Sequence, residues 1–403
     1  MSDTTTVTTT KSWGSRIKSA LAGIIVGPIL IIGGSVLLWT NEGNNARMIA
    51  GMNEGRKSVV EIQENSIDPT NEGKLVHLVG DATTSDILRD PEVGLSITGI
   101  VLDRHVEMYQ WEEKKHTESH DNVGGSETTT TTYTYSKVWD SDKHNSSSFN
   151  TTTGHENPKD WKYDSQMWHA TQVNIDQYNL TSELIGKIDP TTPINLASHG
   201  MMTQSGEIIS GNTLYVGANQ NSPTIGDLRV TYKVAESPLK LSILAKQTQN
   251  SLSTYIASSD ADITRVSAGN KSAQEMFADM ESENTLMTWI FRGLGFFLIF
   301  FGFGLFLSIL PMLAMFLPFL GHVVNFGVSL LAFLATVVLG GGVVITAWFV
   351  YRPLLALLIL TIVGIIAGGI IYVLRMKQRE NTRILTSTDV PTTSNSNLPP
   401  TQL

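Results

Sequence analysis

Residues 289–310 read WIFRGLGFFLIFFGFGLFLSIL, and they belong to a long stretch, residues 286–374, that contains no Asp or Glu. The ionisable side chains of this stretch, apart from two tyrosines, are Arg292, His322 and Arg352. Even on the lowest experimental scales, a charged side chain at the centre of a bilayer costs roughly 3 kcal/mol. An acid-free run of this length therefore indicates membrane-embedded helices.

Prolines and polar residues divide this stretch into three apolar segments, and a fourth lies near the N-terminus. About 20 apolar residues are needed to cross a bilayer core. The sequence therefore predicts four transmembrane helices, at residues 20–39, 289–310, 323–349 and 353–374. A signal peptide is the alternative for the first segment, but its apolar run is long and ends at Trp39 without an Ala-x-Ala cleavage pattern. This favours an uncleaved anchor.

Basic residues flank the predicted membrane region at both ends of the chain: Lys11, Arg16 and Lys18 on one side, Arg375, Lys377 and Arg379 on the other. The positive-inside rule places residues 1–19 and 375–403 in the cytoplasm. We expect the first ten residues and the polar C-terminal tail to be disordered. Residues 40–288 are then an extracytoplasmic domain, periplasmic in a bacterium or lumenal in a eukaryote.

Two arginines, Arg292 and Arg352, lie within about a turn of predicted helix ends. A long basic side chain in this position reaches the headgroup phosphates while its stem stays in lipid. Both are predicted interfacial anchors, and a buried functional arginine is the alternative. Aromatic residues near the span ends agree with this placement: Trp39, Trp289, Trp348 and Tyr351.

Two pairs of glycines have the spacing that lets helices approach closely in lipid. Gly23 and Gly27 lie in the first segment, and Gly364 and Gly368 lie in the fourth. Within lipid, helix association depends on van der Waals packing, which small residues permit. We predict that both segments lie at helix interfaces, within one chain or between chains.

The central region reads as a β-rich α+β domain. Period-two alternation or β-branched residues predict strands at residues 75–79, 96–102, 105–111, 228–234 and 239–246. In the third of these, Val106 and Met108 alternate with Glu107, Tyr109 and Trp111. The first two are predicted core, and the other three are a predicted partner surface, because aromatic residues are enriched at interfaces. A helix-like segment at residues 272–280 leads into the second span.

Residues 112–159 are rich in Thr, Ser, His, Asp and Gly. Such a composition buries little apolar area, so a mobile insertion is expected. Aromatic and β-branched residues near its centre indicate that part of it pairs as a strand or edge hairpin. Four Asn-x-Ser/Thr sequons, which matter only in a eukaryotic lumen, begin at Asn145, Asn150, Asn179 and Asn270.

Composition and motifs exclude several function classes. The chain has no cysteine, which removes disulfides, Cys-ligated zinc and thiol catalysis. The central region holds 34 acidic residues against 19 Lys and Arg, so binding to nucleic acid phosphates is not expected. His116 and His120 are four apart with Glu118 between them, but the zinc-protease pattern requires Glu where Thr117 stands. No catalytic, cofactor or metal residue is predicted.

Several segments resemble the transmembrane protein 43 family, also called LUMA. They are Thr40-Asn41-Glu42-Gly43, Asn71-Glu72-Gly73-Lys74-Leu75-Val76-His77, Arg104-His105-Val106-Glu107-Met108-Tyr109-Gln110-Trp111, Gly226-Asp227-Leu228-Arg229-Val230 and Tyr351-Arg352-Pro353-Leu354. The layout of one span, a large domain and three spans is similar too. On its own chemistry, Asn-Glu-Gly is a turn signal in which the glycine adopts positive φ.

The resemblance implies a membrane-organising scaffold and not an enzyme. Animal members of the family look like proteins of the endoplasmic reticulum and inner nuclear membrane that self-associate and engage lamins and emerin. Those partners apply only if this chain is eukaryotic, whereas the absence of cysteine favours a bacterial cytoplasmic membrane. The alternative function is a channel or transport subunit built from the C-terminal helices, and a hydrolase is the third hypothesis. The expected partners are lipid, further copies of the chain and other membrane proteins.

Overall fold

A computed structural model describes residues 3–199, 204–314 and 318–387. The chain divides into two compact units, residues 1–341 and 342–403. The helices are α1 (Trp13–Ser58), α2 (Ser182–Ile185), α3 (Ala273–Leu307), α4 (Ile309–Ala314), α5 (Pro318–Tyr351) and α6 (Pro353–Ser387), with short 3-10 turns at Pro69–Asn71, Ser146–Ser148 and Leu196–Ser198.

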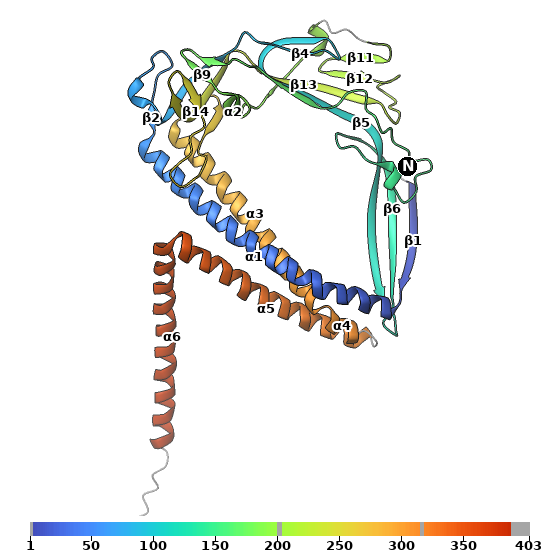
Figure 1. The fold of residues 1–403 in the computed structure, drawn as a ribbon. Coiled ribbons are helices and arrows are strands. Elements are labelled where there is room, and N and C mark those ends of the chain that lie inside the picture. Colours follow the sequence, from blue (N-terminus) through green and yellow to red (C-terminus); the bar gives the residue numbers. More distant parts are fainter. Residues whose placement is uncertain (1–2, 200–203, 315–317, 388–403) are drawn as a thin grey trace, which may run out of the picture. The chain divides into compact units, whose positions relative to one another are not determined.

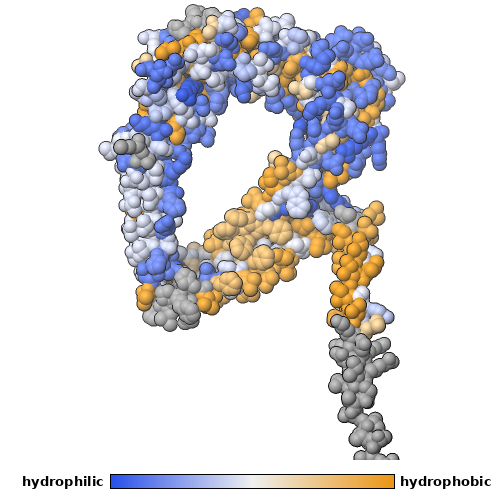
Figure 2. Space-filling model, turned by 180° about the vertical axis from the view of Figure 1, so that it is seen from behind, coloured by the Kyte–Doolittle hydropathy of each residue, from blue (hydrophilic) through white to orange (hydrophobic). Residues whose placement is uncertain are grey.

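Four helical segments are long and apolar enough to cross a membrane: Trp13–Ser58, Ala273–Ala314, Val323–Tyr351 and Ala356–Met376. The first three contain the predicted spans, and the fourth overlaps the predicted span 353–374 from Ala356 onward. In Figure 2 the hydrophobic colour is concentrated on helices, while the β-rich region is largely hydrophilic. The protein is therefore a multi-pass membrane protein with a β-rich domain, as the sequence predicts.

Helices extend beyond the predicted spans in two places. Thr40-Asn41-Glu42-Gly43, interpreted above as a turn, lies inside α1, so the turn prediction is wrong there. The same prediction is confirmed at the second Asn-Glu-Gly, where Gly73 has a φ of 74°. α6 continues to Ser387, which makes the first part of the predicted disordered tail helical. The remainder of that tail, residues 388–403, lies outside the described residues.

The larger of two sheets has nine strands, in the order β1-β6-β5-β13-β12-β11, with β10 on β13 and both β4 and β7 on β5. Their bounds are β1 Asp3–Lys11, β4 Ile87–Asp90, β5 Leu95–Asp121, β6 Glu127–Asp140, β7 Gln166–His169, β10 Thr192–Pro193, β11 Glu207–Ser210, β12 Thr213–Val216 and β13 Leu228–Glu236. The antiparallel neighbour of β5 is β13 over its first part and β6 over its second part.

The second sheet has seven strands, and β14 pairs with both β3 and β16 at its centre. The bounds are β2 Val60–Glu61, β3 Leu75–Thr83, β8 Asn174–Ile175, β9 Tyr178–Leu180, β14 Leu239–Thr248, β15 Ser251–Ser253 and β16 Arg265–Ala268. All five predicted strand segments are confirmed, and two of them, 96–102 and 105–111, are parts of the single strand β5.

The main apolar core lies in the domain and includes the predicted core residues. Val106, Met108 and Leu228 are each at most 1% exposed. A smaller cluster joins the domain to the helices, where Met52 of α1 and Phe277 of α3 pack with buried residues of the second sheet. α3 begins in a capping box formed by Ser272 and Glu275, which explains why the predicted helix starts there.

The N-terminal residues differ from expectation. Asp3–Lys11, expected to be disordered, forms β1 and pairs with β6 over nine consecutive positions. The second part of β5, β6 and β1 form a three-stranded ribbon that reaches the start of α1 (Figure 1). The predicted hairpin within residues 112–159 is confirmed by the pairing of β5 with β6. Thr-rich strands pair well here because β-branched side chains suit an extended backbone.

The loop of this hairpin is fastened to the start of α1. The Arg16 guanidinium lies 2.8 Å from an Asp121 carboxylate oxygen and 3.2 Å from one of Glu127, and it donates to the carbonyl of Gly125 at 3.0 Å. A polar strand ribbon does not cross hydrocarbon. If residues 1–19 lay on the opposite side of the membrane from the domain, as predicted, β1 could not pair with β6. The ribbon and the predicted placement of residues 1–19 are therefore incompatible.

Candidate functional site

The first candidate region is the contact between α1 and α3, where Gly23 and Gly27 lie. A Cβ added at Gly23 would lie 2.6 Å from the carbonyl oxygen of Leu305, and one at Gly27 would lie 2.6 Å from that of Gly302. Both distances are too short for any side chain. The two helix backbones are therefore in direct contact within one chain, as small residues permit in lipid.

The second glycine pair has different surroundings. A Cβ added at Gly364 or Gly368 meets no atom of its own compact unit, residues 342–403, within 4 Å. The prediction that α6 lies at a helix interface therefore stays a prediction.

A buried ion pair lies further along the contact between α1 and α3. Arg292 of α3 donates to both carboxylate oxygens of Glu42, through Nε at 2.5 Å and Nη2 at 2.9 Å. Glu42 is 1% exposed, and the guanidinium also lies 4.8 Å from the ring centroid of Trp289. Bidentate pairing of this kind is strong and directional. Arg292, predicted to reach headgroup phosphates, instead has a carboxylate partner in its own chain.

Asparagines extend this polar contact along α1. Asn41 donates to the carbonyl of Thr288 at 3.1 Å, and the side chain of Asn284 donates to that of Asn45 at 2.8 Å. The Thr40-Asn41-Glu42-Gly43 segment thus supplies interhelical contacts. Sequence reasoning missed Glu42 because its partner lies 250 positions away.

Arg352, the other predicted anchor, lies between α5 and α6. Its backbone N–H donates to the carbonyl of Trp348 at 2.7 Å, so the chain keeps helical hydrogen bonding up to Pro353. The anchoring role of its side chain stays a prediction.

The predicted partner surface lies on an interior strand. Glu107 is opposite Arg229 of β13, and Tyr109 is opposite Trp139 of β6. Trp111 has its backbone N–H and C=O bonded to the side chain of Asn157. Each side of this strand therefore already has a hydrogen-bonding neighbour, and the partner surface formed by its side chains stays a prediction.

The side chains of this strand nevertheless form a half-buried surface of alternating rings and cations. Trp139 lies 5.2 Å from the ring of Tyr109, and the guanidinium of Arg229 lies 4.0 Å above the ring of Trp139. The ammonium of Lys137 lies 4.9 Å from the ring of Trp111. We call these five residues the aromatic surface. The two tryptophan rings each have one cation over the face, an arrangement that also recognises ligands.

The Gly226-Asp227 segment holds the end of this sheet. Asp227 accepts hydrogen bonds from the Thr224 backbone at 2.8 Å and from the hydroxyl of Tyr215. Burial, followed by the bond to Asp227, raises the pKa of the Tyr215 hydroxyl well above its ordinary value. The hydroxyl remains a donor at neutral pH, so this cluster is a structural one.

A second buried polar cluster surrounds Arg104. Its guanidinium donates to Asp90 at 2.7 Å and to the carbonyl of Asp164 at 2.7 Å, while Tyr232 donates to Asp90 at 2.6 Å. Asp90 is fully buried. Every strong donor and acceptor here is engaged, which indicates a structural role for Arg104 within the segment that resembles the known family.

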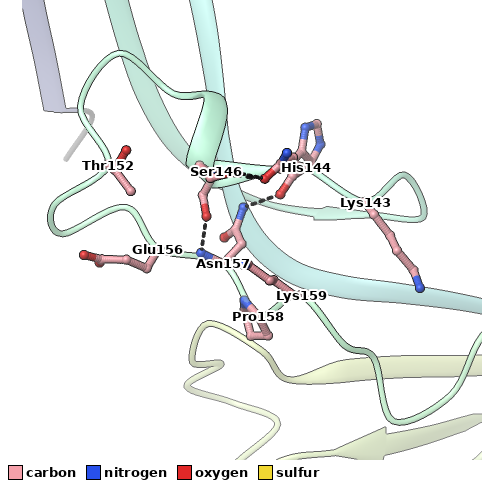
Figure 3. Close-up of a pocket in the computed structure, with 10 residues that line it drawn as sticks. Lys143, His144, Ser146, Thr152, Glu156, Asn157, Pro158 and Lys159 are labelled. Carbon is pink, nitrogen blue, oxygen red and sulfur yellow. Dashed lines mark hydrogen bonds between the residues drawn. The ribbon is translucent and has the colours of Figure 1, made fainter.

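A polar pocket of about 580 Å³ lies in the loop between β6 and β7. Figure 3 shows the side chain of Asn157 directed toward the carbonyl of His144 and the backbone of Asn157 bonded to the hydroxyl of Ser146. The nearby Lys143 is paired with Asp164 at 2.7 Å. These contacts hold the loop against Trp111.

His116 and His120 lie on β5, an extended strand, and not on a helix. Four positions along an extended strand place these two side chains far apart. Among the described residues, no group of three or more His, Asp and Glu is positioned to hold a metal ion.

The comparisons with known proteins agree with this architecture. The family model for Transmembrane protein 43 matches residues 108–353. Human Transmembrane protein 43 is 32% identical over 355 residues, which is 85% of this chain and 88% of the human protein. The Transmembrane protein 43 homolog of Drosophila melanogaster is 28% identical over 358 residues, covering 85% and 93% of the two chains. No solved structure matches the chain.

Apolar helices and a β-rich domain define an integral membrane protein. The extent of the family match and the similarity to the human protein then identify the family. The chain belongs to the transmembrane protein 43 family.

Proposed function

We propose that this protein is a membrane scaffold without catalytic activity, which self-associates and binds other membrane proteins through its β-rich domain. The observation that carries this proposal is the three-stranded ribbon of β5, β6 and β1. Beyond the domain core, residues 114–120 of β5 are exposed, as are most residues of β1. A sheet that extends beyond the core with no second layer packed on it leaves its faces and its edge accessible to other proteins.

The aromatic surface is the second element of the proposal. Its rings are held in place by cations of the same sheet, so little conformational entropy is lost when a partner covers them. Tyrosine, tryptophan and arginine are also the residues most enriched at binding hot spots. Tyr109 and Trp111 are its proposed centre.

The proposed location follows from charge and family. Arg375, Lys377 and Arg379 support a cytoplasmic end for α6. In a bacterium the site is the cytoplasmic membrane; in a eukaryote it is the endoplasmic reticulum and the inner nuclear membrane. Lamin- and emerin-type partners belong to the proposal only in the second case.

Crosslinking in native membranes followed by mass spectrometry tests this function. We expect crosslinked copies of the chain together with a reproducible set of other membrane proteins. Tyr109→Ala with Trp111→Ala should weaken the binding of those partners roughly thirtyfold or more, since the loss of one hot spot costs about 2 kcal/mol. Trp161→Ala, which removes a ring outside the aromatic surface, is the matched control. Recovery of monomers alone, with no enriched protein, would refute the scaffold function.

A further inference from the structure

β1 is the last strand of its sheet and has one neighbour, β6. Its sequence, Asp-Thr-Thr-Thr-Val-Thr-Thr-Thr-Lys from Asp3 to Lys11, is symmetric about Val7, with opposite charges at its two ends. Most of its residues are exposed. The strand therefore presents a nine-residue edge to solvent.

This edge lacks the features with which proteins usually prevent strand pairing. Between Thr4 and Thr10 there is no charge and no proline, and the register with β6 contains no bulge. Natural edge strands are commonly protected by such residues or irregularities. An unprotected flat edge of this length is suited to receive another strand.

The sequence of β1 indicates which strand would pair with this edge. When two copies of β1 pair antiparallel about Val7, Thr4 faces Thr10, and Asp3 of each copy faces Lys11 of the other. Opposite charges and Thr–Thr pairs are both favourable across antiparallel strands. A parallel pair in register would place like charges together at both ends, which is unfavourable.

We propose that the edge of β1 binds a second copy of this chain, strand against strand and antiparallel, with a two-fold axis at Val7. A symmetric contact of this kind uses the same patch on both subunits. The inference rests on the proposed self-association and supplies its site. It also assigns a role to the N-terminal residues, which the aromatic surface does not involve.

The chain holds β1 in position for this contact. Its inner side pairs with β6 from Asp3↔Tyr135 to Lys11↔Glu127. The hydroxyl of Thr151 donates to that of Thr5 at 3.3 Å, and Arg16, soon after the strand, is 7% exposed in its contacts with the hairpin. The strand is therefore preorganised, and pairing needs little further ordering.

The absence of cysteine allows a direct test in native membranes, with single cysteines and a mild oxidant. In the proposed dimer the two residues at position 7 have Cα atoms about 5 Å apart, within the range of a disulfide. The two residues at position 4 are roughly 20 Å apart. We therefore expect Val7→Cys to form a covalent dimer and Thr4→Cys, the matched control in the same strand, to form almost none. A mixture of Thr4→Cys and Thr10→Cys chains should again crosslink.

A further variant keeps the test decisive. Thr6→Cys with Thr132→Cys joins positions that are opposite within one chain, and an intrachain disulfide there shows that β1 is seated on β6. If that disulfide forms and the unaltered chain assembles, yet Val7→Cys stays monomeric, the edge contact is refuted while self-association stands. Equal dimer yields from Val7→Cys and Thr4→Cys would also refute it. An unaltered chain that is monomeric by native mass spectrometry would overturn both proposals.

Discussion

The two glycine pairs of this protein have the same spacing and opposite surroundings. Gly23 and Gly27 contact the backbone of α3, whereas Gly364 and Gly368 meet no neighbour within their own compact unit, residues 342–403. Both helices are apolar, so lipid solvates either of them well. The comparison shows that small residues permit close packing but do not select a partner.

For α1, the choice of α3 as its packing partner comes from polar residues beyond Gly23 and Gly27. Glu42 and Asn41 of α1 find Arg292 and Thr288 on α3. In the apolar part of α6, the hydroxyl of Thr361 donates to the carbonyl of Leu357 in its own helix at 2.8 Å. We infer that ion pairing and interhelical hydrogen bonds fix the α1–α3 register, and the glycines then allow contact.

The largest loss of stability is expected when the ion pair between Glu42 and Arg292 is removed. Glu42→Ala leaves Arg292 largely buried without its carboxylate, and loss of one partner of a buried pair costs about 3–5 kcal/mol. Thermal unfolding in detergent should show a clear fall in the midpoint. Arg292→Ala in the same chain should recover part of the loss.

An exposed ion pair between the same helices is the control. Arg56 and Glu281 lie 2.6 Å apart, and the Glu281 side chain is 53% exposed. Exposed pairs contribute about 0–1 kcal/mol, so Glu281→Ala should barely change the midpoint. Similar losses for Glu42→Ala and Glu281→Ala would contradict the selecting role of the buried pair.

A smaller effect is expected at the glycines. Gly27→Leu introduces atoms where Gly302 already lies, and overpacking of this kind costs about 1–3 kcal/mol. Gly364→Leu should change the unfolding midpoint less, because a Cβ there meets no atom of its own compact unit, residues 342–403. Gly33→Leu, at an open position of α1, controls for leucine itself. A loss at Gly364 equal to that at Gly27 would mean that α6 has a packed neighbour within the protein.

The hairpin loop should respond to a third change. Arg16→Ala removes two carboxylate contacts and one carbonyl contact, worth about 2 kcal/mol together. Hydrogen exchange should accelerate in residues 112–134 and stay constant in the domain core. Lys18→Ala, two positions away on the same helix, is the control, and equal acceleration by both would indicate a general charge effect.

The last prediction involves no change in stability. Because the ribbon is polar, Thr6→Cys and Asn145→Cys should react with an impermeant thiol reagent from the same side of sealed vesicles. Labelling from the same side would mean that α1 does not carry the chain across the membrane between β1 and the domain. Labelling from opposite sides would support the positive-inside prediction for residues 1–19 and remove β1 from the sheet.

The sequence predicted the four apolar helices, the five strands and the buried Val106 and Met108, because each depends on local composition or period-two alternation. It failed where the partner is distant. Thr40-Asn41-Glu42-Gly43 has turn chemistry in isolation, and only α3 makes it helical. β1 likewise has a disordered composition until β6 supplies its hydrogen bonds.

The surface of the domain was predicted in part. Glu107, Tyr109 and Trp111 do share one face, but the sequence could not show that β6 and β13 flank their strand. Lys137, which lies over Trp111, and Arg229, which lies over Trp139, come from the flanking strands, and nothing near Trp111 in sequence indicates them. The exposed edge strand described above is the N-terminal strand β1, and not the strand that carries these three residues.

The length of β5 has a mechanical consequence. The strand runs without interruption for 27 residues, from the domain core to the loop beside Arg16, or about 90 Å at the usual rise of a strand. Its ladder bonds to β6 lie across the strand direction, so tension along the ribbon loads them all at once in shear. A pull on the start of α1 would thus reach the core through a stiff connection, and the ribbon would act as a tether under load.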